Sequence, residues 1–486
     1  MIFEILAERN ENDEKKFYYD NETNTLKDED GQIFQFSDME KVKEQKGKQT
    51  HVVPFSKDFP LKKQNLVKKV KIQMGLSCNY SCDYCSQKFV ERPPETSKKD
   101  IDAFMEMFNK LEFKEQDGLA IEFWGGEPFV YWKTMKPLAE AIRDKFVSWK
   151  NKPRFSVITN GSILNSDINA WLVYMGFSVS ISHDGPGQHV RGPDPFDDPK
   201  QKKVIMELYN VLRPMGRISF NSMLYAKNQS RKEIHEWFVK MTGDPDVYHG
   251  EGGIVDAYDE DGAANSLITK KDHFEYRKLS FNDLFSTDCN INFMQINDKM
   301  SGFMQSVLGQ NESKYLGQKC GMDEEDVIAI DLRGNVITCQ NVSAVQTSLN
   351  GQPHLSGHVS DIGSVEIKTA THWMNRQECP SCPVLHLCKG ACMFLDGKFW
   401  EISCANAYSD NIPIFALAFE KITNGYIPKF INNDSLPDVR KDIWGTMLEH
   451  EEIPVKKVIP IKVVSNKTTV LDGIEVYEVA KVKYES

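Results

Sequence analysis

The sequence predicts an α/β fold: a barrel or partial barrel of parallel strands, followed by a cysteine-rich region with little regular structure. Short β-like runs alternate with amphipathic helical runs from residue 69 to about residue 258. Such repeats give parallel strands joined by helical crossovers. The cysteines are clustered, and most of the eleven fall between residues 289 and 404. The chain therefore divides into a regular part and a part organised around thiols.

Six strands are expected in the barrel. They are residues 69–77, 119–126, 154–161, 177–185, 217–224 and 252–258. Several end in loops rich in Gly, Asn, Asp or Cys, which suits a site at the carboxyl ends of the strands.

Apolar residues recur at helical spacing between these strands. The expected helices are 101–111, 135–146, 166–175, 199–213 and 230–241. Ser166 can cap the third of these helices, and Gly176 can end it.

Four segments follow from these patterns. They are a strand- and turn-rich N-terminal extension with a linker (1–68), the partial barrel (69–289), a cysteine-rich domain (290–412) and a C-terminal extension (413–486). Within the last segment, residues 453–464 and 473–484 alternate apolar with polar residues, so they predict a terminal β-hairpin.

Composition excludes several classes of protein. The 486 residues include 59 Lys+Arg and 70 Asp+Glu, a net charge of −11. A general nucleic-acid binder needs basic surface instead. The N-terminus lacks the pattern of a signal peptide and no apolar run is long enough to span a bilayer, so a cytoplasmic protein without membrane contact is expected. In a reducing compartment, clustered cysteines more often hold metal than form disulfides.

The first cysteine group is Cys78-x3-Cys82-x2-Cys85, on the loop after the first barrel strand. Three thiolates can bind three irons of a [4Fe–4S] cluster and leave the fourth iron open to another ligand. A zinc knuckle or a ferredoxin segment is the alternative. The spacing, with Tyr84 before the third cysteine, resembles the radical S-adenosylmethionine (SAM) superfamily, which implies a partial (β/α)6 radical SAM barrel.

Three further motifs follow in the order that this family has. Gly125-Gly126-Glu127-Pro128 resembles the GGEP motif, which contacts the methionine amino group of SAM, and glycines permit close approach of the backbone. Thr159-Asn160-Gly161 occupies the place of the ribose contacts. Ser182-His183-Asp184-Gly185-Pro186 resembles the S-x-D-G-P segment of the peptide-modifying subgroup. The resemblance also implies that Arg191 holds the SAM carboxylate. Loop histidines such as His183 are expected to be solvated.

The second cysteine group resembles the seven-cysteine SPASM domain, which carries two auxiliary [4Fe–4S] clusters. Carried over by position, the resemblance assigns three cysteines to auxiliary cluster I and four to auxiliary cluster II: Cys320, Cys339 and Cys392, then Cys379, Cys382, Cys388 and Cys404. A zinc ribbon is the alternative, but zinc sites rarely interleave so many thiolates. The eighth cysteine of the sulfatase-maturing relatives has no counterpart here. The fourth iron of auxiliary cluster I then has no protein ligand, a non-cysteine ligand, or Cys289 as its ligand. If Cys289 is not a ligand, it is an unrelated buried thiol.

The resemblance implies an enzyme that reductively cleaves SAM to a 5′-deoxyadenosyl radical and abstracts hydrogen from a peptide or protein substrate, with electrons from a flavodoxin- or ferredoxin-type donor. The protein's own task would be binding, orientation and exclusion of solvent. Three alternatives stay open: a sulfatase-maturase-like oxidase that forms formylglycine, an iron–sulfur electron carrier or scaffold without SAM chemistry, and a radical SAM enzyme with a small-molecule substrate. Asp256 is a poor candidate for a catalytic base, and no other catalytic side chain is indicated.

Overall fold

The computed structural model describes most of the chain. The described residues are 1–46, 52, 54–115, 118–287, 289, 291–348, 351–368, 370–444, 468–471 and 474–477. By their contacts they divide into two units, Met1–Thr446 and Met447–Ser486.

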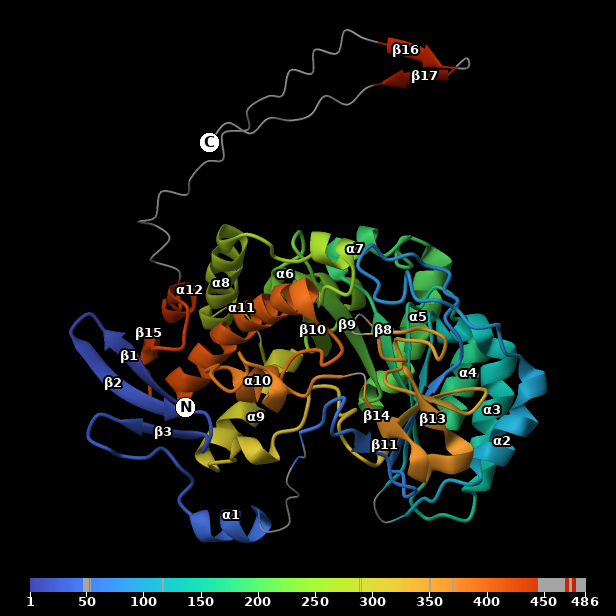
Figure 1. The fold of residues 1–486 in the computed structure, drawn as a ribbon, viewed down its shortest axis with the longest axis horizontal. Coiled ribbons are helices and arrows are strands. Elements are labelled where there is room, and N and C mark those ends of the chain that lie inside the picture. Colours follow the sequence, from blue (N-terminus) through green and yellow to red (C-terminus); the bar gives the residue numbers. More distant parts are fainter. Residues whose placement is uncertain are drawn as a thin grey trace. The chain divides into compact units, whose positions relative to one another are not determined.

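Six parallel strands form the expected partial barrel, in sequential order across one sheet. Figure 1 labels three of them, β8, β9 and β10, side by side. They are β5 (Lys69–Gln73), β6 (Ala120–Trp124), β7 (Arg154–Thr159), β8 (Ser178–Ser182), β9 (Ile218–Leu224) and β10 (His249–Ile254). The last strand begins before the predicted 252–258 and ends at Ile254. Because all neighbouring pairs among these six strands are parallel, their carboxyl ends meet at one edge.

Amphipathic helices connect these strands, and their apolar faces share one hydrophobic core with them. They are α2 (Ile101–Phe108), α3 (Trp132–Lys145), α4 (Ser166–Met175), α5 (Pro199–Leu212) and α6 (Arg231–Thr242). Gly176 ends α4 with φ of 77°, as predicted. The cap of α4 is Asn165 rather than Ser166, since the Asn165 side chain accepts hydrogen bonds from Asp167 N and Ile168 N.

The sheet continues from the barrel into the cysteine-rich region. Strand β11 (Val327–Asp331) pairs parallel with β5, and β12 (Asn335–Ile337) and β13 (Leu355–His358) follow antiparallel. Short strands β4 (Leu61–Lys62) and β14 (Glu366–Ile367) pair nearby. The cysteine-rich region is therefore joined to the barrel by main-chain hydrogen bonds.

Helices dominate the remainder of the first unit. They are α7 (Glu260–Ala264), α8 (Lys270–Phe285), α9 (Gln295–Leu308), α10 (Leu385–Cys388), α11 (Gly397–Ile422) and α12 (Asp438–Lys441). Helix α11 carries Cys404 and runs through residues 412 and 413, where the sequence suggested a boundary.

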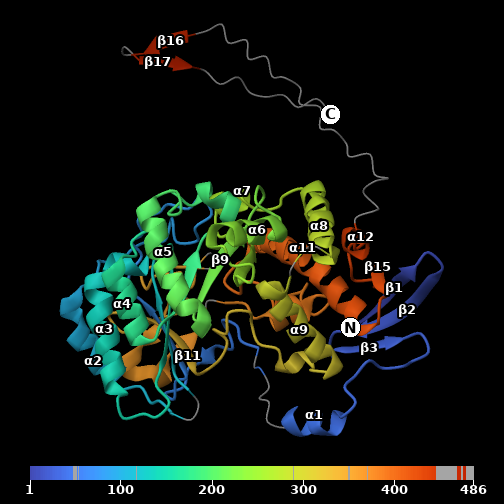
Figure 2. The ribbon, with the colours of Figure 1, turned by 180° about the vertical axis from the view of Figure 1, so that it is seen from behind.

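The N-terminal extension forms a sheet with a strand from the far end of the first unit. Strands β1 (Ile2–Asn10), β2 (Asp13–Asp20) and β3 (Thr25–Asp28) are antiparallel neighbours, and β15 (Ile427–Asn432) pairs with β1. Both views show this pairing (Figure 1, Figure 2). Helix α1 (Met39–Lys46) follows. Apolar side chains of the sheet pack against α8, α9 and α11, which fastens the extension to the molecule.

The second unit contains a two-stranded hairpin of β16 (Thr468–Leu471) and β17 (Ile474–Tyr477). Strand β17 lies within the second predicted run, whereas the first run, 453–464, lies outside the described residues. No helix in the described part of the chain is long and apolar enough to cross a membrane.

Candidate active site

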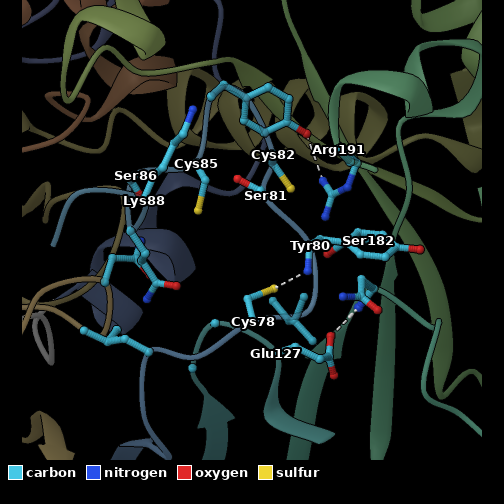
Figure 3. Close-up of a pocket in the computed structure, with 18 of the residues that line it drawn as sticks. Cys78, Tyr80, Ser81, Cys82, Cys85, Ser86, Lys88, Glu127, Ser182 and Arg191 are labelled. Atoms are coloured by element: carbon cyan, nitrogen blue, oxygen red, sulfur yellow. Dashed lines mark hydrogen bonds between the residues drawn. The ribbon is translucent and has the colours of Figure 1, made fainter. Parts of the chain in front are cut away.

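The first cysteine group faces a cavity of about 460 Å³ at the carboxyl ends of the barrel strands. Figure 3 shows the sulfur atoms of Cys78, Cys82 and Cys85 directed into this space from one loop. Backbone Tyr80 N–H donates to Cys78 Sγ at 3.3 Å. Burial raises the pKa of the Cys82 thiol to about 12, although the positive charge of Arg191 opposes the effect. A buried thiol of this kind stays protonated until a metal displaces its proton.

The Gly-Gly-Glu-Pro turn packs directly on the start of the cysteine loop. A Cβ atom on Gly126 would lie 2.5 Å from Ser77 O, and one on Gly125 would lie 2.7 Å from Gly75 O. Two backbone bonds join the segments, from Gly126 N to Gly75 O and from Glu127 N to Ser77 O, both 3.1 Å. The two glycines are required for this contact, in addition to any contact with a ligand.

Glu127 fixes the end of the next strand rather than pointing freely into the cavity. Its carboxylate accepts hydrogen bonds from Thr159 Oγ1 at 2.8 Å, Asn160 N at 2.7 Å and Phe129 N at 3.1 Å. Burial raises the pKa of Glu127, and these three donors counteract the shift. The GGEP and TNG segments thus form one hydrogen-bonded wall.

Arg191 lies in the cavity wall and is mostly buried, with a side-chain exposure of 12%. Its Nη1 donates to Tyr84 Oη at 2.9 Å and to Asp184 Oδ1 at 3.4 Å. Its Nε is buried and has no hydrogen-bond partner within the described residues. Arg191 lines the cavity, and a mostly buried guanidinium with a hydrogen-bond donor still unused suits an anionic ligand group.

Asp184 does not line the cavity but holds Arg191 and the cysteine loop in place. Its carboxylate accepts hydrogen bonds from Tyr84 Oη and from Met223 N, the latter at 2.9 Å. Asn228 Nδ2 donates to Asp184 O at 2.8 Å. Of the residues that the sequence assigned to SAM, Asp184 and Pro128 do not line the cavity. The other seven line it: Gly125, Gly126, Glu127, Thr159, Asn160, Ser182 and Arg191.

His183 is a structural residue, so the expectation of a solvated histidine is wrong. It is fully buried and stacks on Trp237 with ring centroids 4.4 Å apart. Its Nε2 contacts Asp194 Oδ1 at 3.0 Å, and its Nδ1 accepts a hydrogen bond from Gly185 N. The apolar packing around β8 and α6 excludes water from this ring.

The cavity is also lined by residues to which the sequence assigned no contact with SAM. Asn221 and Met223 lie on β9, and Tyr258 follows β10. Asp256 also faces the cavity, and burial raises the pKa of its carboxyl group. The alternation of strand residues gave the only available signal for Asn221 and Met223.

The second cysteine group occupies two places. Cys379, Cys382, Cys388 and Cys404 line one small cavity of about 20 Å³. Burial, together with mutual repulsion between thiolates, raises the pKa of Cys382 to about 12 and that of Cys388 to about 11. These are the four cysteines that the resemblance assigned to auxiliary cluster II.

The other three thiols lie nearer to the barrel. Cys320 and Cys339 flank the β11–β12 hairpin, and Tyr258 Oη donates to Cys392 Sγ at 3.1 Å. Lys71 Nζ donates a hydrogen bond to Cys320 O at 3.4 Å. This bond connects barrel strand β5 to the segment that carries Cys320. Cys339 and Cys392 pack against one hydrophobic cluster and Cys289 against another.

No disulfide joins the cysteines, all eleven of which lie in the described residues. No group of three His, Cys, Asp or Glu side chains within the described ranges forms a site for a single metal ion. A [4Fe–4S] cluster distributes its thiolates over several iron atoms, so the sulfur atoms do not converge on one point. The donor set in each place, thiols with N–H or O–H donors to sulfur, fits iron–sulfur chemistry.

The comparisons with known proteins agree with this geometry. Residues 72–238 match the sequence model of the Radical SAM superfamily. The barrel segment is therefore similar to radical SAM domains.

Two relatives and a solved structure show how far the similarity extends. The radical SAM cyclopropyl synthase TigE of Paramaledivibacter caminithermalis is 23% identical over 67% of this chain and 68% of its own length. A cysteine-type anaerobic sulfatase-maturating enzyme of Clostridium perfringens is 22% identical over 65% of this chain and 85% of its own length. A structure of native anSMEcpe with bound AdoMet and the Cp18Cys peptide superposes with a TM-score of 0.52, at 18% identity, over 74% of this chain and 98% of that chain. The radical SAM partial-barrel fold is therefore confirmed.

Proposed function

We propose that this protein is a radical SAM enzyme that modifies a peptide or protein substrate. The observation that carries the proposal is one cavity that contains Cys78, Cys82 and Cys85 together with the strand-end residues Glu127 and Arg191. An electron carrier needs no large cavity beside its cluster, so this space favours the binding of SAM and a substrate.

Each wall of the cavity suits one part of SAM. The three thiols would hold a [4Fe–4S] cluster, and the guanidinium of Arg191 suits the SAM carboxylate. The Gly125–Glu127 backbone, with Thr159 and Asn160, suits its amino group and ribose. When bound, the cluster would supply the electron for reductive cleavage of SAM, and the resulting radical would abstract hydrogen from the substrate.

The peptide substrate is inferred from the second cysteine group and from the relatives. We propose that the seven cysteines form a SPASM domain with two auxiliary [4Fe–4S] clusters. The anSMEcpe structure contains a bound peptide. A flavodoxin- or ferredoxin-type protein would supply the electron.

The test is anaerobic reconstitution with iron and sulfide, followed by incubation with SAM and dithionite. We expect 5′-deoxyadenosine by liquid chromatography. Its absence, also with candidate peptides added, would favour the electron carrier.

Co-expression with a short Cys-, Ser- or aromatic-rich peptide encoded beside the gene tests the substrate class by mass spectrometry. A loss of about 2 Da indicates a cross-link or oxidation. A formylglycine product would instead support the sulfatase-maturase-like oxidase, against which the missing eighth cysteine counts.

A further inference from the structure

A second cavity adjoins the first one. It has a volume of about 140 Å³, and Ser86, Tyr258 and Asn341 line both cavities. We name this smaller cavity the side lobe. It also touches Cys339, so it lies between the SAM-binding cavity and the second cysteine group.

The wall of the side lobe is largely apolar and comes from two distant parts of the chain. It includes Phe89 and Val90 from the loop after Cys85, and Val342, Phe394 and Leu395 from the cysteine-rich region. Phe89 is 65% exposed, which is unusual for a large apolar side chain at a cavity. Val90, Phe394 and Leu395 are buried, whereas Phe89 offers an exposed apolar face at the edge of the side lobe.

The polar groups of the side lobe favour an uncharged ligand. None of the residues that line it is Lys or Arg. Asp259 is already used, since its carboxylate caps α7 by accepting from Gly262 N at 2.7 Å. Burial lowers the pKa of His354 to about 4, so this residue is neutral, and its Nδ1 is bonded to Thr338 Oγ1 at 2.7 Å. An unpaired charge buried there would cost several kcal/mol.

One of the residues that line the side lobe, Gln346, has a side-chain polar atom without a partner. Gln346 Oε1 is buried and accepts no hydrogen bond from the described residues. Such an atom requires a donor, and a peptide N–H can supply it.

We propose that the side lobe is a specificity subsite that binds one aliphatic or aromatic side chain of the substrate, with Gln346 Oε1 accepting a hydrogen bond from the substrate backbone. The volume suits a single side chain, because pockets for whole small ligands measure about 300–1,000 Å³. The inference rests on the proposed peptide substrate, and it names the chemistry by which the substrate is selected.

The experiment measures binding of four N-acetyl amino-acid amides to the reconstituted, SAM-loaded enzyme by ligand-observed NMR. The probes are those of leucine, phenylalanine, lysine and aspartic acid. We expect the two apolar amides to bind saturably and to compete with each other, and the two charged amides to bind at least about tenfold more weakly.

Two variants locate the binding. Phe89→Ala should weaken the phenylalanine amide about tenfold. Its matched control, Phe59→Ala, removes another exposed phenylalanine (76% exposed) that does not line the side lobe, and should have no effect. Thr347→Trp fills the side lobe from its exposed rim and should also weaken both apolar amides, whereas Val345→Trp, two residues away and outside the lining, should not.

Equal binding of charged and apolar amides, or affinities that Phe89→Ala and Thr347→Trp leave unchanged, would overturn the proposal. The formation of 5′-deoxyadenosine is recorded for every variant as a separate readout. If it forms normally but no amide binds, the side-lobe proposal fails and the radical SAM chemistry stands. If none forms in the wild-type protein, the proposed function fails whatever the amides do.

Discussion

The two cysteine groups differ in how the chain brings their thiols together. Cys78, Cys82 and Cys85 come from one loop and face a cavity of about 460 Å³. The thiols of Cys379, Cys382, Cys388 and Cys404 come from a loop, the short helix α10 and the long helix α11, and they surround only about 20 Å³. Local spacing suffices for the open site, which has room for SAM, whereas the closed site depends on the tertiary structure. The difference fits the proposal that SAM binds beside the first group, because, of these two sets of thiols, only the first faces a cavity with room for a ligand.

Removal of the first group gives the largest expected effect. The Cys78→Ala/Cys82→Ala/Cys85→Ala variant should form no 5′-deoxyadenosine above background and should lose one cluster's share of iron, because no thiolate remains to hold that cluster. Chromatography and iron analysis measure both quantities. The matched variant Cys379→Ala/Cys404→Ala should also lose iron but retain some SAM cleavage. Full activity in the first variant would remove the basis of the comparison.

The next largest effect is expected in residues 389–391, which join Cys388 of one thiol set to Cys392 of the other. Lys389, Gly390 and Ala391 all have positive φ, and a Cβ on Gly390 would lie 2.5 Å from Trp373 Cβ. Gly390→Ala should lower the free energy of unfolding by about 3 kcal/mol and reduce iron content.

Gly397→Ala is the control for Gly390→Ala in the same urea titration. Gly397 also has positive φ, but an added Cβ there would meet no atom within 4 Å. It should cost only about 1 kcal/mol. Equal costs for the two variants would show that the close contact at Gly390 is unimportant.

Glu127 tests whether the open site is as rigid as its hydrogen bonds suggest. Oε1 of Glu127 accepts from Thr159 and Phe129, and Oε2 accepts from Asn160. In Glu127→Gln one of these oxygens becomes an NH2 group, which cannot accept a hydrogen bond, so the bonds to that oxygen are lost. The expected loss is about 2 kcal/mol of stability and about tenfold in SAM affinity, measured by urea titration and by equilibrium binding. Glu140→Gln is the control, because Glu140 accepts a single bond from Trp171 through Oε1, and the amide keeps an oxygen. SAM affinity equal to wild type would mean that the wall does not shape the site.

Buried histidines provide a pH test of whether the two regions unfold together. Burial lowers the pKa of His249 in the barrel to about 3 and that of His354 in the cysteine-rich region to about 4, from 6.5. At pH values between the lowered pKa and 6.5, each of these histidines is protonated in the unfolded chain but not in the native protein. Stability is therefore present above pH 6.5 and is lost as the pH falls towards 4.

If the regions unfold as one, His249→Gln and His354→Gln should each reduce the slope of unfolding free energy against pH by about 1.4 kcal/mol per pH unit in this window. Urea titrations at several pH values measure the slope, and His189→Gln, at an exposed histidine, is the control. An effect confined to one of the two unfolding transitions would show that the regions are independent.

The smallest effect is expected at Cys289. This residue packs with the hydrophobic side chains of the N-terminal sheet, α8, α9 and α11, whereas Cys339 and Cys392 pack against a different group of hydrophobic side chains. Cys289→Ala should therefore retain all of its iron, as measured by iron analysis and electron paramagnetic resonance. Loss of one cluster's share would identify Cys289 as a ligand of auxiliary cluster I and exclude an open iron there.

Much of the barrel could be predicted because its signals are local. The helix end at Gly176 depends on one residue that adopts positive φ readily. The error at Asn165 has a local cause too, since Asn and Ser are both good caps and only the backbone geometry selects between them. The placement of His183 could not be predicted, because its burial depends on Trp237, which comes from another helix.

The sequence by itself determined the strand–helix alternation and the Cys78–Cys85 loop, since periodicity and short spacing are properties of neighbouring residues. Only the tertiary structure showed that Asp184 accepts a hydrogen bond from Arg191, that β15 pairs with β1 in the N-terminal sheet, and that Phe89 and Phe394 line one cavity. Those contacts join residues far apart in the chain. They depend on sheet register and burial, which the complete fold sets.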